Sequence, residues 1–139
     1  MNRRSLLIGG AASVAAVLVS KNATASTAPT MAGGVYYTAQ NPGRWAKKAA
    51  GHAPVIEAKS DGGSTTLQVV TGHEMKGYEH YIIKHMILDA NYQFVAEHFF
   101  NPEKDNAPIS SFNLGDKKGT FYALSVCNLH DTWMSSITI

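Results

Sequence analysis

The sequence predicts an all-β protein, and three observations support this fold class. Short runs rich in β-branched and aromatic residues recur along residues 54–139, each bounded by Gly, Pro, Asn or Asp. No stretch beyond residue 25 repeats its apolar side chains with the 3.6-residue period of a convincing helix. A hydrophobic content of 45% in 139 residues is enough for one packed core. Together these features predict a seven-stranded antiparallel β-sandwich of the immunoglobulin-like type.

The predicted strands follow one another with turn signals between them. Asp61-Gly62-Gly63 form the first turn, and Asp89-Ala90-Asn91 predict a hairpin between the two longest runs. A polar loop at 101–106 and a turn at 116–119 separate the later runs. In chain order, we expect strands at 54–58, 64–70, 80–88, 92–100, 108–114, 120–126 and 133–139.

The start of the chain has the features of an export signal. Arg3 and Arg4 precede an apolar run at 6–19, which is too short to span a bilayer comfortably. Ala23-Thr24-Ala25 form a small-residue cleavage pattern. The paired arginines favour a twin-arginine-type signal peptide and a periplasmic or otherwise exported protein. An ordinary secretory signal and a retained membrane anchor are the alternatives.

We expect the chain to divide into a signal at 1–25, a flexible lead-in at 26–43 and a folded domain at 44–139. The net charge of +2 combines 12 basic with 10 acidic residues, and three of the basic residues lie in the signal. Without the signal the charge is therefore slightly negative. Because the domain has no basic stripe with interleaved aromatic residues, nucleic acid is not an expected partner.

The single cysteine, Cys127, limits the chemistry that the chain can support. It excludes an intramolecular disulfide, a four-cysteine metal site and a Cys-x-x-Cys redox pair. An exported protein needs a reason to keep one free thiol in an oxidising compartment, and metal ligation supplies such a reason.

Histidines supply further metal-ligand candidates. His85 and His98 alternate with apolar side chains along predicted strands and are expected to pack against their neighbours. The remaining histidines lie in predicted loops or next to strand ends, where they can approach Cys127. Neutral imidazoles combined with one thiolate suit iron or copper. The candidate ligands are His52, His73, His80, Cys127 and His130. The spacing of the first three histidines does not by itself select them.

Four segments carry a resemblance to a known family. Their sequences are Gly51-His52-Ala53-Pro54-Val55-Ile56-Glu57, Gly72-His73-Glu74-Met75, Glu79-His80-Tyr81-Ile82 and the stretch 118–130, which ends in Cys127-Asn128-Leu129-His130. In order and in approximate spacing they resemble the iron-binding segments of the superoxide reductases, the family that includes neelaredoxin and desulfoferrodoxin. The resemblance covers residues 44–139.

This resemblance implies a mononuclear non-haem iron that cycles between Fe2+ and Fe3+, with five protein ligands and an open sixth position. It implies reduction of superoxide to hydrogen peroxide, with electrons from an unidentified donor. It also implies the single-iron class, because the two-iron members carry an additional four-cysteine iron domain. Members of this class are often homo-oligomers, so a tetramer or dimer is expected. The implied ligands are His52, His73, His80, His130 and the thiolate of Cys127.

Two positions depart from the family pattern. The family has Glu-Lys directly before the first ligand histidine, where this chain has Ala50-Gly51. Lys47 and Lys48 are the nearest basic residues, and they are candidates for steering superoxide; the alternative is a solvated basic pair. Asp131 stands where the family has Gly. Its carboxylate is expected either to orient His130 or to repel an anionic substrate.

Other functions follow from the same residues. An iron site without the Glu-Lys pair suits electron transfer or small-ligand sensing. A blue-copper electron carrier would use Cys127, His130 and Met134, with His80 or His85 as the other histidine. A purely structural binding module is a further alternative.

Overall fold

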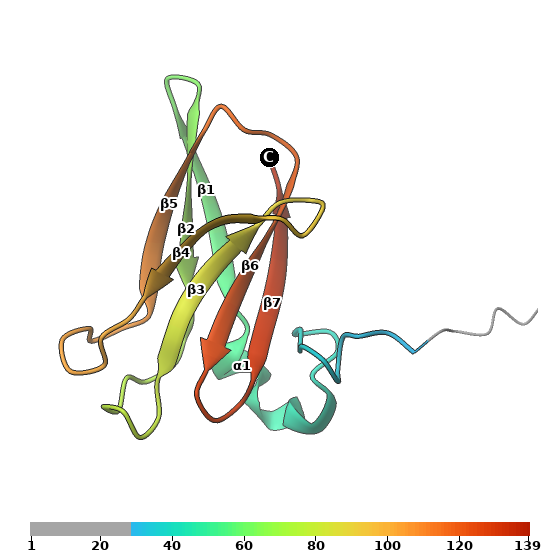
Figure 1. Ribbon diagram of the computed structural model, residues 1–139, viewed down its shortest axis with the longest axis vertical. Helices are drawn as coiled ribbons and strands as arrows, with labels where there is room; N and C mark the ends of the chain where they lie inside the picture. The colour runs from blue at the N-terminus through green and yellow to red at the C-terminus, as the bar shows by residue number, and fades with distance from the viewer. Residues whose placement is uncertain (1–28) are drawn as a thin grey trace, which may run out of the picture.

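The computed structural model describes residues 29–139, which form two packed β-sheets (Figure 1). One sheet has the strand order β1-β2-β5 and the other β4-β3-β6-β7, and all neighbouring strands are antiparallel. The predicted seven-stranded antiparallel sandwich is confirmed, whereas the expected signal at 1–25 lies outside the described residues. The strands are β1 (Val55–Asp61), β2 (Ser64–Val70), β3 (Ile82–Leu88), β4 (Phe94–Phe99), β5 (Ile109–Gly115), β6 (Thr120–Cys127) and β7 (Thr132–Thr138).

Alternating side chains build the core between the two sheets. In β2, every second residue is buried, because successive side chains of a strand point to opposite faces. β6 follows the same alternation up to Cys127, which is the last residue of the strand and is buried. Each fully buried aliphatic or aromatic side chain stabilises the fold by about 1.5–3 kcal/mol. The main cluster consists of Leu67, Val69, Ile87, Phe112, Leu114, Phe121 and Ala123.

Two turns set strand limits that differ from the predicted ones. Gly62 and Gly63 have φ values of 56° and 83°, which a two-residue hairpin turn requires, and β1 therefore extends to Asp61. Tyr92, with φ 60°, belongs to the β3–β4 turn. The carboxylate of Asp89 accepts backbone hydrogen bonds within this turn, and β4 consequently begins at Phe94 rather than at residue 92.

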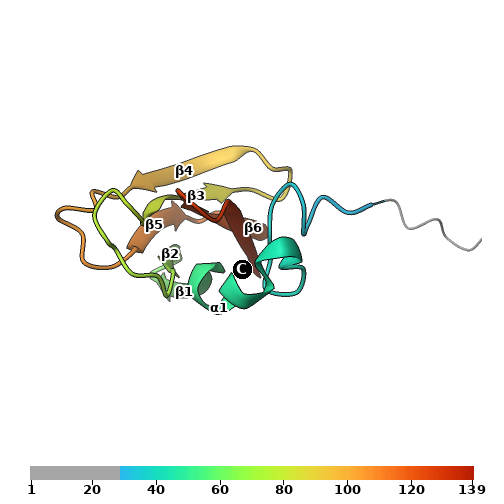
Figure 2. The same ribbon diagram turned by 90° about the horizontal axis from the view of Figure 1, so that it is seen from below.

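A short helical segment precedes β1, and the prediction of no helix was wrong here. It consists of η1 (Gly43–Lys48), a 3-10 segment with a kink at Trp45, and α1 (Ala49–His52). The segment is too short to show a helical period, and no side chain caps either helix. Figure 1 shows it at the end of the sandwich where the β6–β7 turn lies, and Figure 2 looks onto that end. Within residues 29–139, no helix is long and apolar enough to cross a membrane.

The end of the expected flexible lead-in packs on the sandwich. Tyr37 is 4% exposed, and its ring lies 5.6 Å from that of Trp133. Its backbone N–H donates to Thr132 O, and its carbonyl accepts from the N–H of Met134. The chain near Tyr37 therefore extends the edge of the second sheet beside β7, so the folded unit begins before residue 44.

His85 packs in the core, but it does so through hydrogen bonds that the alternation did not reveal. Its ring is fully buried, with Nε2 2.8 Å from Thr71 Oγ1 and Nδ1 2.7 Å from Ser110 Oγ. Thr71 Oγ1 also lies 2.8 Å from Ser125 Oγ. This network joins β3, β5 and β6 within the core, and burial lowers the pKa of His85 to about 4.

The buried imidazole of His85 predicts a loss of stability in mild acid. Below pH 6.5 the unfolded chain binds a proton that the folded chain excludes until about pH 4, so the free energy of unfolding falls between these values. Over the whole range from pH 6.5 to about pH 4, the free energy of unfolding falls by roughly 3 kcal/mol. In urea titrations at pH 7 and pH 5, His85→Gln is expected to show a smaller pH difference than the wild type, by about 2 kcal/mol.

His98→Gln is the matched control for this measurement, because His98 is exposed on β4. The charge of His98 lowers the pKa of His85 less than burial does, so His98→Gln should change the wild-type pH difference much less than His85→Gln does. An equal pH difference in His85→Gln and the wild type would contradict the assignment of this acid sensitivity to His85.

Candidate metal centre

The five candidate ligands come from four separate segments that meet at one end of the sandwich. His52 ends α1, His73 and His80 lie in the connection between β2 and β3, and Cys127 ends β6. His130 lies in the β6–β7 turn. One donor atom from each residue lies within 4.8 Å of every other. His52 and Cys127 are buried, and the other three are partly exposed.

The four histidine nitrogens follow one another at short, similar distances. Nε2 of His73 lies 2.9 Å from Nε2 of His80, which lies 3.0 Å from Nδ1 of His130. Nδ1 of His130 lies 3.1 Å from Nε2 of His52. Cys127 Sγ lies 3.7 Å from His130 Nδ1 and 3.9 Å from His73 Nε2. Three histidines thus present Nε2 and one presents Nδ1.

Hydrogen bonds outside the group turn two nitrogen lone pairs towards its centre. Nδ1–H of His52 donates to the carbonyl of Lys48 at 2.9 Å, and Nδ1–H of His73 donates to the carbonyl of Glu74. A neutral imidazole has one N–H, so Nε2 of both rings carries a lone pair. An outer carbonyl that fixes the tautomer in this way is typical of metal-ligating histidine.

The group fits a metal ion better than a hydrogen-bonded network. His80 and His130 would each have to donate inward to satisfy the lone pairs of His73 and His52, and their own two N–H groups would then face each other at 3.0 Å. Metal–nitrogen bonds of about 2.1 Å at right angles instead place neighbouring nitrogens about 3 Å apart. The three observed separations, 2.9–3.1 Å, match that value.

The protonation state of the histidines also suits a metal. Burial lowers the pKa of His52 to about 4. Burial is likewise the main cause that lowers the pKa of His73, His80 and His130. All four rings are therefore neutral at pH 7, the form in which imidazole binds a metal. The thiolate of Cys127 would be the only anionic donor among the five.

The two lysines before His52 differ in their relation to the candidate ligands. The carbonyl of Lys48 accepts the hydrogen bond from His52, and the positive charge of its exposed side chain contributes to the lowered pKa of His80 and of His130. Within residues 29–139, no hydrogen bond or ion pair joins Lys47 to the candidate ligands. The sequence left the two lysines equivalent, whereas in the structure Lys48 interacts with the ligand histidines.

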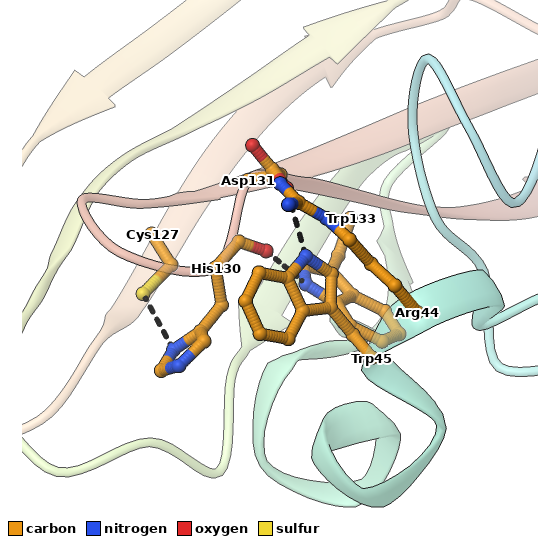
Figure 3. A network of polar contacts seen from close by, with 6 residues as sticks. All are labelled: Arg44, Trp45, Cys127, His130, Asp131 and Trp133. Atoms are coloured by element: carbon orange, nitrogen blue, oxygen red, sulfur yellow. Dashed lines mark hydrogen bonds and ion pairs between the residues drawn. The ribbon is translucent and has the colours of Figure 1, made fainter.

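Asp131 does not orient His130 through its carboxylate, contrary to one expectation. Its Oδ2 accepts hydrogen bonds from Arg44 Nη2 at 2.7 Å and from Trp45 Nε1 at 2.8 Å (Figure 3). Hydrogen bonds from Trp45 and Arg44 lower the pKa of Asp131. Asp131 has φ 65°, a conformation that glycine adopts without strain, which explains how a glycine can stand at this position in the family.

Asn128 was missed by the sequence reasoning, although it lies between two ligands of the same turn. Its Oδ1 accepts from the backbone N–H of Tyr81 at 3.0 Å. Its Nδ2 donates to the carbonyls of Tyr78 and Glu79 at 3.3 and 3.0 Å. Asn128 therefore holds the segment that carries His80 against the turn that carries Cys127 and His130. The amide at this position is the only signal in the sequence, and it does not identify the partners.

The alternative copper site is only partly assembled: Cys127, His130 and His80 lie in the ligand group, but His85 and Met134 lie elsewhere. Both ring nitrogens of His85 are hydrogen-bonded to hydroxyl groups in the core. Met134 lines an apolar cavity of about 350 Å³ with Met31, Tyr36 and Leu124, and none of the five candidate ligands lines that cavity. Cys127 and His130 instead share their position with the three upstream histidines.

Comparisons with known proteins found a matching family model and similar solved structures. The desulfoferrodoxin family model matches residues 44–136. A variant of the superoxide reductase (neelaredoxin) from Ignicoccus hospitalis is 28% identical with a TM-score of 0.65, and the alignment covers 76% of this chain and 93% of that one.

Two further solved structures are similar. A superoxide reductase in the oxidized state is 30% identical with a TM-score of 0.53, over 63% of this chain and 87% of that one. The reduced superoxide reductase (neelaredoxin) from Archaeoglobus fulgidus is 25% identical with a TM-score of 0.57, over 75% of this chain and 97% of that one. No curated protein sequence matches the chain.

Proposed function

We propose that this chain, which belongs to the desulfoferrodoxin family, is an exported superoxide reductase that converts superoxide to hydrogen peroxide. The chain is an oxidoreductase, and similar solved proteins are named superoxide reductases. One observation carries the proposal: four neutral histidine nitrogens and one cysteine sulfur lie within 4.8 Å of one another at one end of the sandwich.

The family binds mononuclear iron, and the donor set of this chain fits that metal. Bound iron(II) would supply one electron to superoxide, which becomes hydrogen peroxide on uptake of two protons. His52, His73, His80 and His130 would hold the metal as neutral ligands, and Cys127 would offset part of its charge. The carbonyls of Lys48 and Glu74 keep the rings of His52 and His73 in the ligating tautomer.

Lys48 is proposed to attract the anionic substrate. Ala50 and Gly51 have no charged group, and Lys48 is the lysine whose charge reaches both His80 and His130. Lys48→Ala is expected to lower the second-order rate constant for superoxide roughly threefold to tenfold and to weaken its dependence on ionic strength. Stopped-flow or pulse-radiolysis kinetics over a range of salt concentrations would measure both effects.

Lys47→Ala is the matched control, because it removes the neighbouring positive charge; its rate should stay close to the wild type. Gly51→Lys offers a test in the opposite direction. A Cβ at Gly51 would lie 3.6 Å from the carbonyl of Gly72, an ordinary contact, so a side chain fits there. In the Lys48→Ala background it should restore the rate. Unchanged kinetics in Lys48→Ala would remove this residue from the mechanism.

Electron transfer or small-ligand sensing at the same iron site is the second candidate. The observation that favours it is the pair Ala50-Gly51, which lacks the charged groups that the family has before its first ligand histidine. A protein with the iron site intact, but without consumption of pulsed superoxide, would support this candidate over superoxide reduction.

The proposal includes export through a twin-arginine-type signal at 1–25 and an assembly of two or four copies that receives electrons from a separate donor. The paired arginines and the lone cysteine support export, and the family resemblance supports the assembly. The N-terminal mass of protein recovered from the periplasm would test the signal, and sedimentation would test the assembly.

The central experiment is metal analysis with EPR on protein isolated from its native compartment, followed by pulsed superoxide kinetics. One iron per chain, a high-spin ferric signal after oxidation and fast loss of superoxide are expected. One copper per chain, with copper hyperfine structure, would overturn the proposal. Protein that arrives without metal would be reconstituted with Fe(II) before the same measurements.

A further inference from the structure

Asp131, the second departure from the family pattern, binds the helical segment that also contains the first, Ala50-Gly51. The first removes a lysine near His52, since the chain has Ala50-Gly51 there, and the second places Asp131 after His130. Asp131 accepts hydrogen bonds from Arg44 and Trp45, which belong to η1. Lys48 is the last residue of the same helix. Asp131 is thus joined by hydrogen bonds to the segment that ends in Lys48.

The contacts around Asp131 fasten η1 to the turn that carries His130. The indole ring of Trp45 meets the His130 ring edge-on, with 4.7 Å between ring centroids (Figure 3). The guanidinium of Arg44 lies 4.5 Å from the Trp45 ring centroid, and both side chains donate to the same carboxylate oxygen of Asp131. On the other side of the turn, Trp133 Nε1–H donates to the carbonyl of His130 at 2.8 Å. The turn is therefore held on both sides.

The far end of the helical segment is joined to the centre by His52. Its Nδ1–H donates to the carbonyl of Lys48, and the N–H of Ala53 donates to the carbonyl of Ala49. The segment from 43 to 52 is thus attached at Asp131 near its start and at His52 at its end. η1 has no buried residue, so side-chain contacts of this kind must hold it in place.

We propose that Asp131 is a positioning residue: by accepting hydrogen bonds from Arg44 and Trp45, it holds η1 against the His130 turn and so keeps Lys48 beside His80 and His130. The inference rests on the proposed function insofar as Lys48 attracts the anionic substrate. Arg44 pairs with Asp131 at 2.7 Å and offsets part of the negative charge of the carboxylate.

The conformation of Asp131 allows a clean substitution. Its φ of 65° suits glycine better than aspartate, so Asp131→Gly removes the carboxylate without straining the turn. Asp131→Asn keeps an oxygen acceptor and tolerates the same conformation, but it removes the charge. Glu97→Gln is the matched control, because Glu97 is an exposed carboxylate paired with Lys84 on the second sheet. It changes the net charge by the same amount.

Two readouts other than turnover follow the proposed effect on iron-loaded full-length protein. Hydrogen exchange of the Ala53 amide reports opening of the helical segment, because that amide donates within α1. The dissociation constant of azide, a small monovalent anion, for the oxidised iron reports the positive charge near the centre. Asp131→Gly is expected to speed exchange at Ala53 roughly tenfold, the effect of losing about 1.4 kcal/mol of hydrogen bonding.

Asp131→Gly should also weaken azide binding roughly threefold, towards the value of Lys48→Ala. Asp131→Asn should fall between Asp131→Gly and the wild type, and Glu97→Gln should match the wild type. Because Asp131 acts through Lys48, the double variant Asp131→Gly/Lys48→Ala should bind azide no more weakly than Lys48→Ala alone.

Three results would overturn the inference. Tighter azide binding in Asp131→Gly would mean that the carboxylate repels anions. Independent losses in the double variant would mean that Asp131 does not act through Lys48. Unchanged exchange at Ala53 would mean that Asp131 does not hold the helix. These outcomes are distinct from failure of the proposed function, which would appear as a wild-type protein that binds iron and azide but does not consume superoxide.

Discussion

Replacement of Cys127 by alanine is expected to abolish the thiolate-to-iron absorption band of the oxidised protein. Cys127 is the only cysteine of the chain and ends β6 with its sulfur 3.7 Å from Nδ1 of His130. No other thiolate exists to replace it. We also expect superoxide reduction to fall by more than the roughly 10–100-fold that loss of an outer partner of a metal ligand costs. Visible absorption and pulsed superoxide kinetics on iron-loaded protein would measure both effects.

Cys127→Ser separates charge from packing, because serine keeps nearly the same volume. It should lose the same band, since an oxygen ligand does not produce a thiolate transition. His98→Gln is the control for effects of mutation and iron loading that do not involve the ligands, because His98 lies exposed on β4. A visible band that survives in Cys127→Ala would show that the sulfur does not bind the metal, and it would overturn the five-donor site.

Replacement of His52 by alanine is expected to have the second-largest effect, a loss of bound iron. The buried ring of His52 places Nε2 3.1 Å from Nδ1 of His130, and its other nitrogen is fixed by the carbonyl of Lys48. Loss of a direct ligand should weaken iron binding by at least the roughly 10–100-fold expected for an outer partner. Iron content after dialysis against a chelator, together with EPR of the oxidised protein, would measure this change.

His52→Ala also distinguishes the iron site from the copper alternative. A copper site built from Cys127, His130 and Met134 would not involve His52, and its metal content would be unchanged. His98→Ala removes an exposed histidine of the same kind and should keep both metal content and spectrum. If His52→Ala behaves in the same way as this control, the assignment of His52 as a ligand is wrong.

The strands of the domain could be predicted because apolar and polar side chains alternate between neighbouring residues. The run at 64–70 alternates buried and partly exposed positions along its whole length, and its predicted limits agree with β2. The last predicted strand, 133–139, is displaced by one residue from β7, Thr132–Thr138. β4 was placed less well, because Asp89-Ala90-Asn91 predicted the hairpin but not the positive φ of Tyr92 or the hydrogen bond from Gln93 N–H to Asp89.

The ligand candidates could be selected from the sequence only through the resemblance to a family. Cys127 and His130 are three residues apart and suggest a shared metal by themselves. His52 precedes His130 by 78 residues, and no local rule joins them. The structure brings their nitrogens to 3.1 Å because the segments that carry them end at the same end of the sandwich.

The sequence by itself therefore determined the class of fold, the number of strands and the residue types that could bind a metal. Hydrophobic alternation is local, and each strand carries it independently of the rest of the chain. Only the tertiary structure decided which lysine stands beside the centre, what Asp131 binds, and how Asn128 joins the turn of Cys127 to the segment of His80. The hydrogen bonds of Asp131 and Asn128 join residues 47 or more positions apart, and side chains meet over such separations through strand register and turn conformation rather than through spacing.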